Sequence, residues 1–293
     1  MNRQACSRSK SSLNPAVVIV YPNCKINLGL RILEKRSDGY HNIETAFYPV
    51  NLTDILEIAP CNADEKAVPV HLSQSGFSID GDPGNNLCSK AYKLLKKDFP
   101  DLPKVDMHLH KSVPAGAGLG AGSADGAFTL KLLNENFKLD IPEKKLMEYA
   151  LKLGSDCPFF ILNKPCYATG RGEILDPVQL DLSGHKILLA NPGIHINTGK
   201  AFLGVKPSKP EKSIRDILSL PIIKWKEELI NDFEMSIFKQ YTAISDLKKT
   251  MYDKGALFAL MSGSGSTVYG IFKKDEPVKL SLPENYFVRA LVC

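Results

Sequence analysis

The chain has 293 residues with 44% hydrophobic content, long enough for one large domain or two modest ones with hydrophobic cores. Its longest apolar runs are strand-sized, and its seven cysteines form no CxxC pair, so we expect no membrane span, disulfide framework or zinc site, and a reducing cytoplasm as the location. The net charge of +5 comes from lysines scattered among acids, which is typical of solvated helix faces rather than of a nucleic-acid-binding surface.

The amino-terminal segment is basic and rich in serine. It begins MNRQACSRSKSS, and the first 33 residues contain no acid. Such a composition is similar to an organelle transit peptide, which leaves plastid-type targeting as an alternative to a cytoplasmic location. The segment is short for that role, and we expect residues 1–14 to be a disordered tail before a strand at 16–21.

Strand patterns dominate the next part of the chain. The runs AVVIVYP, INLGLRILEK, ETAFYPV and DILEIAP are separated by Gly, Asp and Asn turns, which predicts an antiparallel or mixed sheet. The stretch NNLCSKAYKLLKKDF has helical apolar spacing behind Asn86, a residue type that caps helices. KVDMHLHK then alternates as a half-buried strand does. His108 and His110 share one face of that strand, but no third metal ligand lies nearby in the sequence, which favours a solvent-facing pair.

The segment PAGAGLGAGSAD, residues 114–125, is unusually rich in glycine and alanine. Glycine loses more conformational entropy on folding than any other residue, and a tight turn would need only one or two. The segment follows a predicted strand and precedes a predicted helix, for which Ser123 or Asp125 is the expected N-cap. A strand, a glycine loop and a helix amino terminus form an arrangement that binds phosphate groups.

Two common phosphate loops do not fit this segment. A P-loop ends in Gly-Lys-Ser/Thr, but no lysine occurs between Pro114 and Lys131. The relaxed dinucleotide pattern matches residues 116–121, yet that fold has a continuously apolar parallel strand before the loop, whereas VDMHLHK alternates and ends in Lys111. The sequence therefore indicates a polyphosphate site of a different kind.

PAGAGLGAGSAD closely resembles the central motif of the GHMP kinases, a group that contains galactokinase, homoserine kinase and mevalonate kinase. The opening PNCKINLGLRILEKRSDGYHNIETAF, with its KINL and DGYH signatures, resembles the branch that phosphorylates diphosphocytidyl methylerythritol. MSGSGSTVYGIF at 261–272 resembles the third motif of the group, and GSDCPFF, GRGE and NDFE follow in the expected order. The resemblance runs from residue 22 to residue 272. Small departures, such as Cys24 where alanine is common and SADG in the glycine segment, leave open only which hydroxyl helps to hold magnesium.

The resemblance implies an α+β protein with the two-domain GHMP kinase fold. Residues 15–180 would form the ATP-binding and catalytic domain, a mixed or antiparallel sheet with helices that is similar to domain 2 of ribosomal protein S5. Residues 181–293 would form a substrate-binding, ferredoxin-like α/β sandwich. Within that part, we expect a strand and loop from residue 186, helices at about 213–219 and 224–254, and strands around SGSGS that close the sheet.

The resemblance also implies a reaction, in which ATP with Mg²⁺ phosphorylates the 2-hydroxyl of the cytidyl substrate in isoprenoid precursor synthesis. The residues that match the catalytic pair are Lys25 and Asp156. Asp156 stands at the start of a predicted short helix, where the dipole and a nearby lysine would favour the ionised carboxylate. It would orient the hydroxyl and take its proton late. From the residues alone, Asp156 would be interpreted as a helix cap.

Further site residues follow from the same resemblance. The phosphates of ATP would lie on Pro114, Ala115, Gly116, Ala117, Gly118, Leu119, Gly120, Ala121, Gly122, Ser123 and Ala124, with the Ser123 hydroxyl as a magnesium ligand and with Asn86 and Lys111 near the adenosine. Tyr40 and Phe202 would stack on cytosine, His41 would bind its edge and Asn27 would place the erythritol. Structural alternatives are that Asn86 only caps a helix, Tyr40 closes a hairpin and Phe202 belongs to the core.

Three other functions remain as alternatives. Another GHMP alcohol kinase is disfavoured by DGYH, and a non-catalytic nucleotide sensor by the presence of both Lys25 and Asp156. A nucleic-acid binder on a related fold is disfavoured because the basic residues are not clustered in the sequence.

We expect a small molecule as the binding partner, with no nucleic acid and no membrane. The sequence does not specify the oligomeric state.

Overall fold

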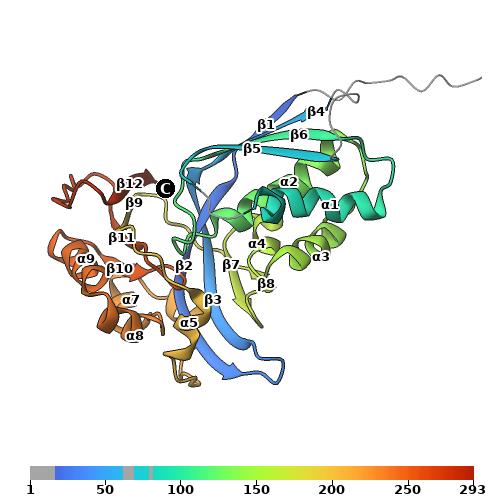
Figure 1. Ribbon diagram of the computed structural model, residues 1–293. Helices are drawn as coiled ribbons and strands as arrows, with labels where there is room; N and C mark the ends of the chain where they lie inside the picture. Colours follow the sequence, from blue (N-terminus) through green and yellow to red (C-terminus); the bar gives the residue numbers. More distant parts are fainter. Residues whose placement is uncertain (1–16, 62–68, 79–81) are drawn as a thin grey trace, which may run out of the picture.

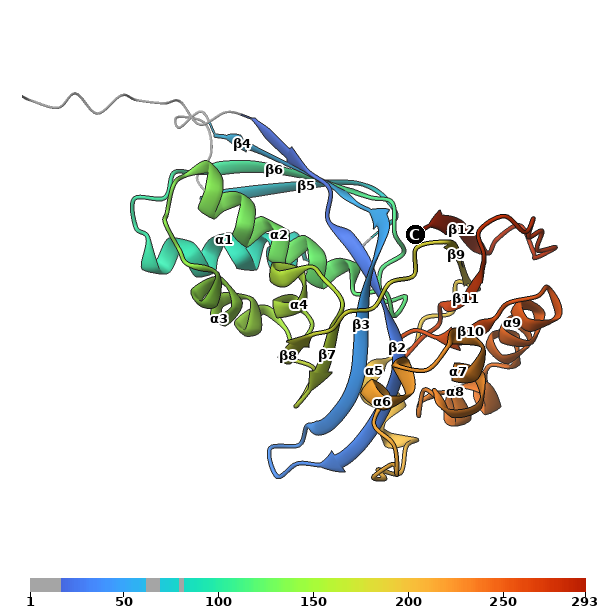
Figure 2. The same cartoon turned by 180° about the vertical axis from the view of Figure 1, so that it is seen from behind.

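The computed structural model describes residues 17–61, 69–78 and 82–293. The expected tail at 1–14 lies outside these residues. Two halves flank a long hairpin formed by β2 (Asn23–Lys35) and β3 (His41–Thr53), as Figures 1 and 2 show from opposite sides. In the described part of the chain, no helix combines the length and the apolar character needed to cross a membrane.

The first sheet has the order β1-β4-β6-β5. It consists of β1 (Val18–Val20), β4 (Ile55–Pro60), β6 (Val105–Lys111) and β5 (Val70–Gly76), of which only the β5–β6 pair is parallel. The alternation expected for 104–111 is confirmed, because Val105, Met107 and Leu109 are buried and the residues between them are partly exposed. The parallel strand β5 did not emerge from the sequence.

Helices cover the apolar face of this sheet (Figure 1). A short 3-10 helix η1 (Pro83–Asn85) precedes α1 (Leu87–Asp98), and α2 (Ala121–Asn136), α3 (Glu143–Leu153) and α4 (Cys157–Leu162) follow. The predicted cap of α1 is confirmed, because the Asn86 side chain accepts a hydrogen bond from the backbone N–H of Cys88 at 2.8 Å. These helices and the sheet enclose one hydrophobic core.

The second sheet, in the order β2-β3-β7-β8, joins the two halves. β7 (Cys166–Thr169) and β8 (Ile174–Pro177) extend the hairpin in antiparallel pairing. Every residue of β2 from Cys24 to Leu30 is buried, which shows that both faces of the strand are covered. Side chains of β2 contribute to a second core, which they share with the third sheet.

The third sheet is antiparallel and has the order β10-β11-β9-β12. Its strands are β9 (His185–Asn191), β10 (Phe258–Met261), β11 (Val268–Lys273) and β12 (Phe287–Val292). Taken as strands one to four of this half, they have the order 2-3-1-4 of a ferredoxin-like sandwich. The predicted α+β two-domain fold is confirmed, and the division between residues 180 and 181 remains a prediction.

The predicted long helix at 224–254 is wrong. Between β9 and β10 the chain forms α5 (Thr198–Leu203), α6 (Ile214–Leu218), α7 (Ile222–Glu228), α8 (Glu234–Gln240) and α9 (Thr242–Asp253). The first break arises because the chain leaves α7 to pair with β2: Leu30 N–H donates to Ile230 O, and Asp232 N–H donates to Leu30 O, both at 2.9 Å. Helical periodicity in the sequence does not report such a long-range pairing.

Candidate active site

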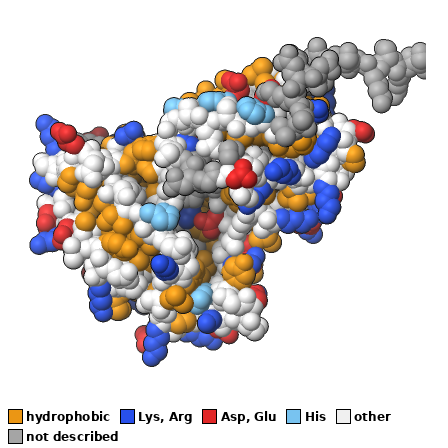
Figure 3. All heavy atoms as spheres, viewed as in Figure 1, with side chains coloured by type: hydrophobic (Ala, Val, Ile, Leu, Met, Phe, Trp, Pro, Cys, Tyr) orange, Lys and Arg blue, Asp and Glu red, His pale blue; other side chains and the backbone are white. Residues whose placement is uncertain are grey.

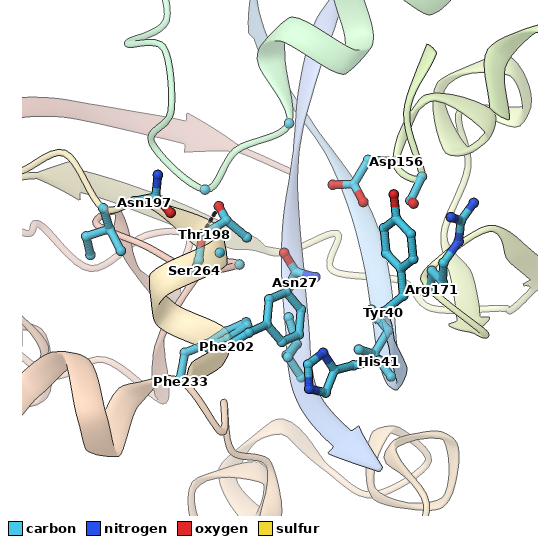
Figure 4. Close-up of a pocket in the computed structure, with 18 of the residues that line it drawn as sticks. Asn27, Tyr40, His41, Asp156, Arg171, Asn197, Thr198, Phe202, Phe233 and Ser264 are labelled. Carbon is cyan, nitrogen blue, oxygen red and sulfur yellow. Dashed lines mark hydrogen bonds between the residues drawn. The ribbon is translucent and has the colours of Figure 1, made fainter. Parts of the chain in front are cut away.

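A pocket of about 730 Å³ opens between the two halves, where the surface is hollowed in Figure 3. Figure 4 shows Tyr40, Asp156 and Arg171 on one wall and Phe202 and Ser264 on the other. Strand β2 runs between the walls. The predicted residues that line the pocket are Lys25, Asn27, Tyr40, His41, Gly116, Gly118, Gly120, Asp156 and Phe202. The fold therefore brings the expected catalytic, glycine-loop and aromatic residues to one cavity.

The Lys25 side chain is held in a single position on β2. Only 3% of the residue is exposed, and its ammonium donates to Asn27 Oδ1 at 2.6 Å. The same group lies 3.3 Å from Asp156 Oδ2 and 4.9 Å from the centre of the Phe47 ring. Its backbone N–H donates to Leu119 O at 3.0 Å, which ties β2 to the glycine loop.

Asp156 is the N-cap residue of α4, as the sequence predicts, but its side chain makes no capping hydrogen bond with the described residues. The carboxylate is 34% exposed and points toward the pocket (Figure 4). The interpretation of Asp156 as only a helix cap therefore does not account for the position of its side chain. Beside it, burial raises the pKa of Cys157 to about 12, which keeps this thiol protonated and unsuited to act as a nucleophile.

The glycine loop presents its backbone to the pocket. Gly116, Gly118 and Gly120 have φ values of 66°, 79° and 68° and line the pocket, whereas the side chains of Ala117 and Leu119 are buried. This alternation leaves backbone rather than side chains on the side of the loop that faces the pocket. The polar N–H groups of the loop can therefore approach an anion closely.

Helix α2 begins earlier than the sequence predicts. Gly120, in the left-handed conformation, is the N-cap residue, so the expectation that Ser123 or Asp125 caps the helix is wrong. Both residues instead lie within the first two turns. The glycine-rich segment itself supplies the first turn, whose N–H groups have no partner within a helix and carry the positive end of its dipole.

The turn at 262–266 packs against the glycine loop, at the seam between the two halves. Ser262 Oγ donates to Gly118 O at 2.8 Å, and Thr267 N–H donates to Ala117 O at 3.2 Å. A Cβ atom on Gly118 would lie 2.1 Å from Ser262 O, so the close approach itself requires glycine. A Cβ on Gly122, by contrast, would meet no atom of the described residues within 4 Å.

The two residues expected near adenosine lie outside the lining of this pocket. Lys111 is only 2% exposed, and its ammonium is ion-paired with Asp54 and, at 2.7 Å, with Asp125. The Lys111 ammonium is therefore held inside the protein by two carboxylates, and a position of this residue near adenosine remains a prediction. Asn86 caps α1 through its side chain. Its contact with a nucleotide remains a prediction.

The buried Lys111 cluster anchors the segment that leads into the glycine loop. Asp54 Oδ1 accepts the backbone N–H groups of Ser112 at 2.7 Å and Val113 at 3.0 Å. Burial lowers the pKa of Lys111, but Asp125 and Asp54 outweigh that effect and raise it. Burial raises the pKa of Asp125 to about 7; Lys111 opposes the shift and Asp54 adds to it. Among the described residues, Asp125 Oδ1 has no hydrogen-bond partner.

The aromatic residues expected to bind cytosine converge on the pocket. Tyr40 is 52% exposed, and His41 stacks on Phe202 with ring centres 4.6 Å apart and an interplanar angle of 12°. Phe202 also packs edge-on against Phe233 at 4.9 Å. One face of Phe202 is thus covered by the His41 ring. The prediction that Tyr40 and Phe202 stack on cytosine did not include this contact. Burial, together with Lys35, lowers the pKa of His41, so its ring is neutral at pH 7.

Asn27 makes hydrogen bonds at both ends of its side chain. Oδ1 accepts from Lys25, and Nδ2 donates to Thr45 Oγ1 at 3.0 Å. Asn27 therefore orients the lysine, and the prediction that it also places the substrate is not tested by these contacts.

Several residues of the pocket wall were not predicted from the sequence. They include Lys35, Arg171, His195, Asn197 and Thr198. Ser264, which also lines the pocket, lies in the SGSGS turn that the sequence places near the phosphates. Arg171 lies in the GRGE motif, and Thr198 lies in the stretch INTGKAF at 196–202 that contains Phe202. Proximity to a predicted motif or site residue was therefore the sequence signal that could have identified both residues. Thr198 and Ser264 share a hydrogen bond at 2.9 Å, which closes the wall formed by the carboxyl-terminal half.

Comparison with known proteins identifies the class that this fold defines. Residues 86–164 match the family described as GHMP kinases N terminal domain, and residues 221–286 match GHMP kinases C terminal. The fold also matches a crystal structure of homoserine kinase from Cytophaga hutchinsonii, with a TM-score of 0.66 at 14% identity, covering 99% of this chain and 97% of that one. The protein is a small-molecule kinase of the GHMP class.

Relatives with higher sequence identity show which family within the GHMP kinases this chain belongs to. A 4-diphosphocytidyl-2-C-methyl-D-erythritol kinase of Bacteroides fragilis is 51% identical over 89% of this chain and 94% of the relative. The corresponding kinase of Bacteroides thetaiotaomicron is 48% identical over 94% and 98%. A crystal structure of 4-(cytidine 5'-diphospho)-2C-methyl-D-erythritol kinase has a TM-score of 0.74 at 29% identity, covering 87% of this chain and 90% of that one. The chain belongs to the 4-diphosphocytidyl-2-C-methyl-D-erythritol kinase family.

Proposed function

We propose that this kinase transfers the terminal phosphoryl group of ATP to the 2-hydroxyl of 4-diphosphocytidyl-2-C-methyl-D-erythritol, a step in the synthesis of isoprenoid precursors. The observation that carries the proposal is the position of the Lys25 and Asp156 pair, 3.3 Å apart, in a pocket that has the glycine loop at one end and the aromatic residues at the other. The substrate named for the relatives carries a cytidyl group and an alcohol, which suit these two ends.

The phosphate end of the site is built from backbone. The glycine loop and the first turn of α2 present N–H groups and the positive end of a helix dipole, both of which favour a polyphosphate. We propose that the ATP phosphates occupy this end along residues 114–124. The Ser262 contact with Gly118 would hold the loop in place while ATP binds.

Magnesium fits this site as a cation held mainly by the nucleotide. Among the described residues there is no group of three or more His, Cys, Asp or Glu side chains that could form a metal cage. Mg²⁺ is commonly bound by substrate phosphates, waters and one or two protein ligands, and the Ser123 hydroxyl in the first turn of α2 is the proposed protein ligand. When bound, the ion would neutralise charge on the transferring phosphoryl group.

The catalytic pair would act on the alcohol at the centre of the pocket. The Asp156 carboxylate would accept a hydrogen bond from the 2-hydroxyl, orient it toward the phosphorus atom and take its proton as the new bond forms. The Lys25 ammonium, fixed by Asn27, would stabilise negative charge on the transferring group. Neither side chain needs to move far, because both already face the pocket.

The aromatic end would recognise the base. Tyr40 offers a free face for stacking, and neutral His41 has both a donor and an acceptor for the polar edge of cytosine. Phe202 would supply the opposite wall. Such a site would select for the cytidyl group rather than for the alcohol alone.

An ATP-consumption assay with the cytidyl substrate, mevalonate, homoserine and galactose tests this function. We expect turnover with the cytidyl substrate only. Turnover with another alcohol alone would establish a different GHMP kinase, and ATP binding without any turnover would favour a nucleotide sensor. We also propose a cytoplasmic location and no nucleic-acid partner.

A further inference from the structure

The turn at residues 170–173, sequence GRGE, brings an arginine against the base-binding end of the pocket. It connects β7 to β8 and is tied to the hairpin, because Ile43 N–H donates to Gly170 O at 2.7 Å. Within the turn, Gly172 N–H donates to Thr169 O at 3.0 Å. The backbone that carries Arg171 is thus fixed to the strand that begins directly after Tyr40.

Arg171 is oriented by a neighbouring acid. Glu173 accepts the backbone N–H of Arg171 through Oε2, and its Oε1 lies 3.7 Å from Arg171 Nε. The guanidinium carbon then lies 4.5 Å from the centre of the Tyr40 ring. Figure 4 shows Tyr40 between Arg171 and the wall that carries Phe202. Arg171 therefore covers one side of a ring whose other side is open to the pocket.

Tyr40 needs such support, because half of it is exposed. It stands at the end of the 36–40 turn, where its N–H donates to Asp38 Oδ1 at 3.1 Å, and Asp38 pairs with Arg36 at 2.9 Å. These contacts fix the backbone of the turn and do not involve the Tyr40 ring. If the Tyr40 ring must become ordered when the base binds, the loss of side-chain entropy lowers the affinity for the base.

We propose that Arg171 is a positioning residue for cytosine recognition, which acts by holding the Tyr40 ring through a cation–π contact in the orientation that stacks on the base. The inference rests on the proposed function, since it assumes that Tyr40 contacts the cytidyl group. Arg171 is not a catalytic residue in this account. Its guanidinium is planar and lies against the ring, so lysine would replace it only in part.

The test measures the affinity for cytidine, which has the base but no phosphate. In Arg171→Met we expect the Kd for cytidine and the KM for the diphosphocytidyl substrate to rise about tenfold, with kcat and the KM for ATP within about twofold of wild type. Arg171→Lys should recover part of the loss. Arg215→Met is a matched control, because Arg215 lies 4.6 Å from the Tyr167 ring outside the pocket lining and should leave all four constants unchanged.

A double-mutant cycle separates action through Tyr40 from direct contact. If Arg171 acts through the ring, Arg171→Met has no further effect on cytidine affinity in a Tyr40→Ala background. If Arg171→Met weakens binding of the diphosphocytidyl substrate but leaves the affinity for cytidine unchanged, Arg171 binds the diphosphate instead, and the inference is wrong. The inference would also be wrong if Arg171→Met lowered the cytidine affinity equally in the wild-type and Tyr40→Ala backgrounds. Failure of wild-type protein to phosphorylate the cytidyl substrate would reject the proposed function itself, which keeps the two failures distinct.

Discussion

The Lys25 ammonium lies 3.3 Å from the Asp156 carboxylate, although one residue belongs to β2 and the other to the start of α4. Asn27 holds the lysine from one side, and the backbone of α4 sets the position of the aspartate. The pair is therefore preorganised before any ligand binds, which is the arrangement that favours charge stabilisation in a transition state.

Removal of either charge should abolish most turnover. We expect Lys25→Met and Asp156→Asn each to lower kcat on the order of 10²–10³-fold, because both groups act on charge that develops during transfer. ATP affinity should change little, since the phosphates bind mainly to backbone N–H groups. Steady-state kinetics and ATP titration of the folded variants check this, and a near-normal kcat in either variant would contradict the assigned roles.

Gly122→Ala should weaken ATP binding without harming the fold. A Cβ at this position meets open space, and alanine is a better helix former than glycine, so thermal stability should be equal or higher. If the phosphates bind along residues 114–124 as proposed, the added methyl group should raise the Kd for ATP about tenfold or more. Calorimetric titration gives the Kd, and an unchanged affinity would place the phosphates elsewhere.

Gly118→Ala is the contrasting substitution in the same loop. Its Cβ would collide with Ser262 O, and its φ of 79° is unfavourable for alanine, so we expect a loss of stability as well as of ATP affinity. A variant with wild-type thermal stability would show that the seam between the two halves can shift to accept a side chain.

Asp125→Asn should change how stability depends on pH. The pKa of Asp125 is raised from 3.8 to about 7 in the folded protein, so between these values the folded state holds a proton that the unfolded state lacks. The contribution of Asp125 to the free energy of unfolding therefore falls as pH rises through that range, by up to about 1.4 kcal/mol per pH unit. Asparagine mimics the protonated form and removes this slope.

Urea unfolding of wild type and Asp125→Asn at pH 5, 6, 7 and 8 measures the effect. The variant should gain stability relative to wild type as pH rises, and the gain should level off above pH 7. A stability difference that is constant across these pH values would show that Asp125 does not titrate in this range.

Tyr40→Ala and His41→Ala should weaken binding of the cytidyl substrate and leave ATP affinity nearly constant. Loss of a stacking platform or of hydrogen bonds to the base costs on the order of 1–3 kcal/mol. Tyr21→Ala is a matched control, because Tyr21 is also an exposed tyrosine but lies outside the pocket lining. Calorimetry with both ligands decides the matter: equal losses for ATP and substrate would indicate a structural turn, and no loss for either would place base recognition elsewhere.

The sequence by itself determined the features that depend on local backbone. The alternation in VDMHLHK gave the half-buried strand β6, Asn86 gave the cap of α1, and the glycine-rich segment indicated a phosphate loop at a helix amino terminus. Motif order then gave the family and the two-domain α+β fold. The strand and the cap are confirmed because side-chain period and capping are set by neighbours along the chain, whereas phosphate binding by the loop remains a prediction.

Only the tertiary structure decided the features that depend on contacts between distant segments. The Lys111 ammonium looks free in the sequence, but in the fold it is buried in ion pairs with Asp54 and Asp125. The pairing of Leu30 with residues 230–232 breaks a segment of helical periodicity, and the GRGE turn brings Arg171 to Tyr40. The physical reason is that desolvation, ion pairing and ring stacking are set by which surfaces pack together, and residue order alone does not specify that packing.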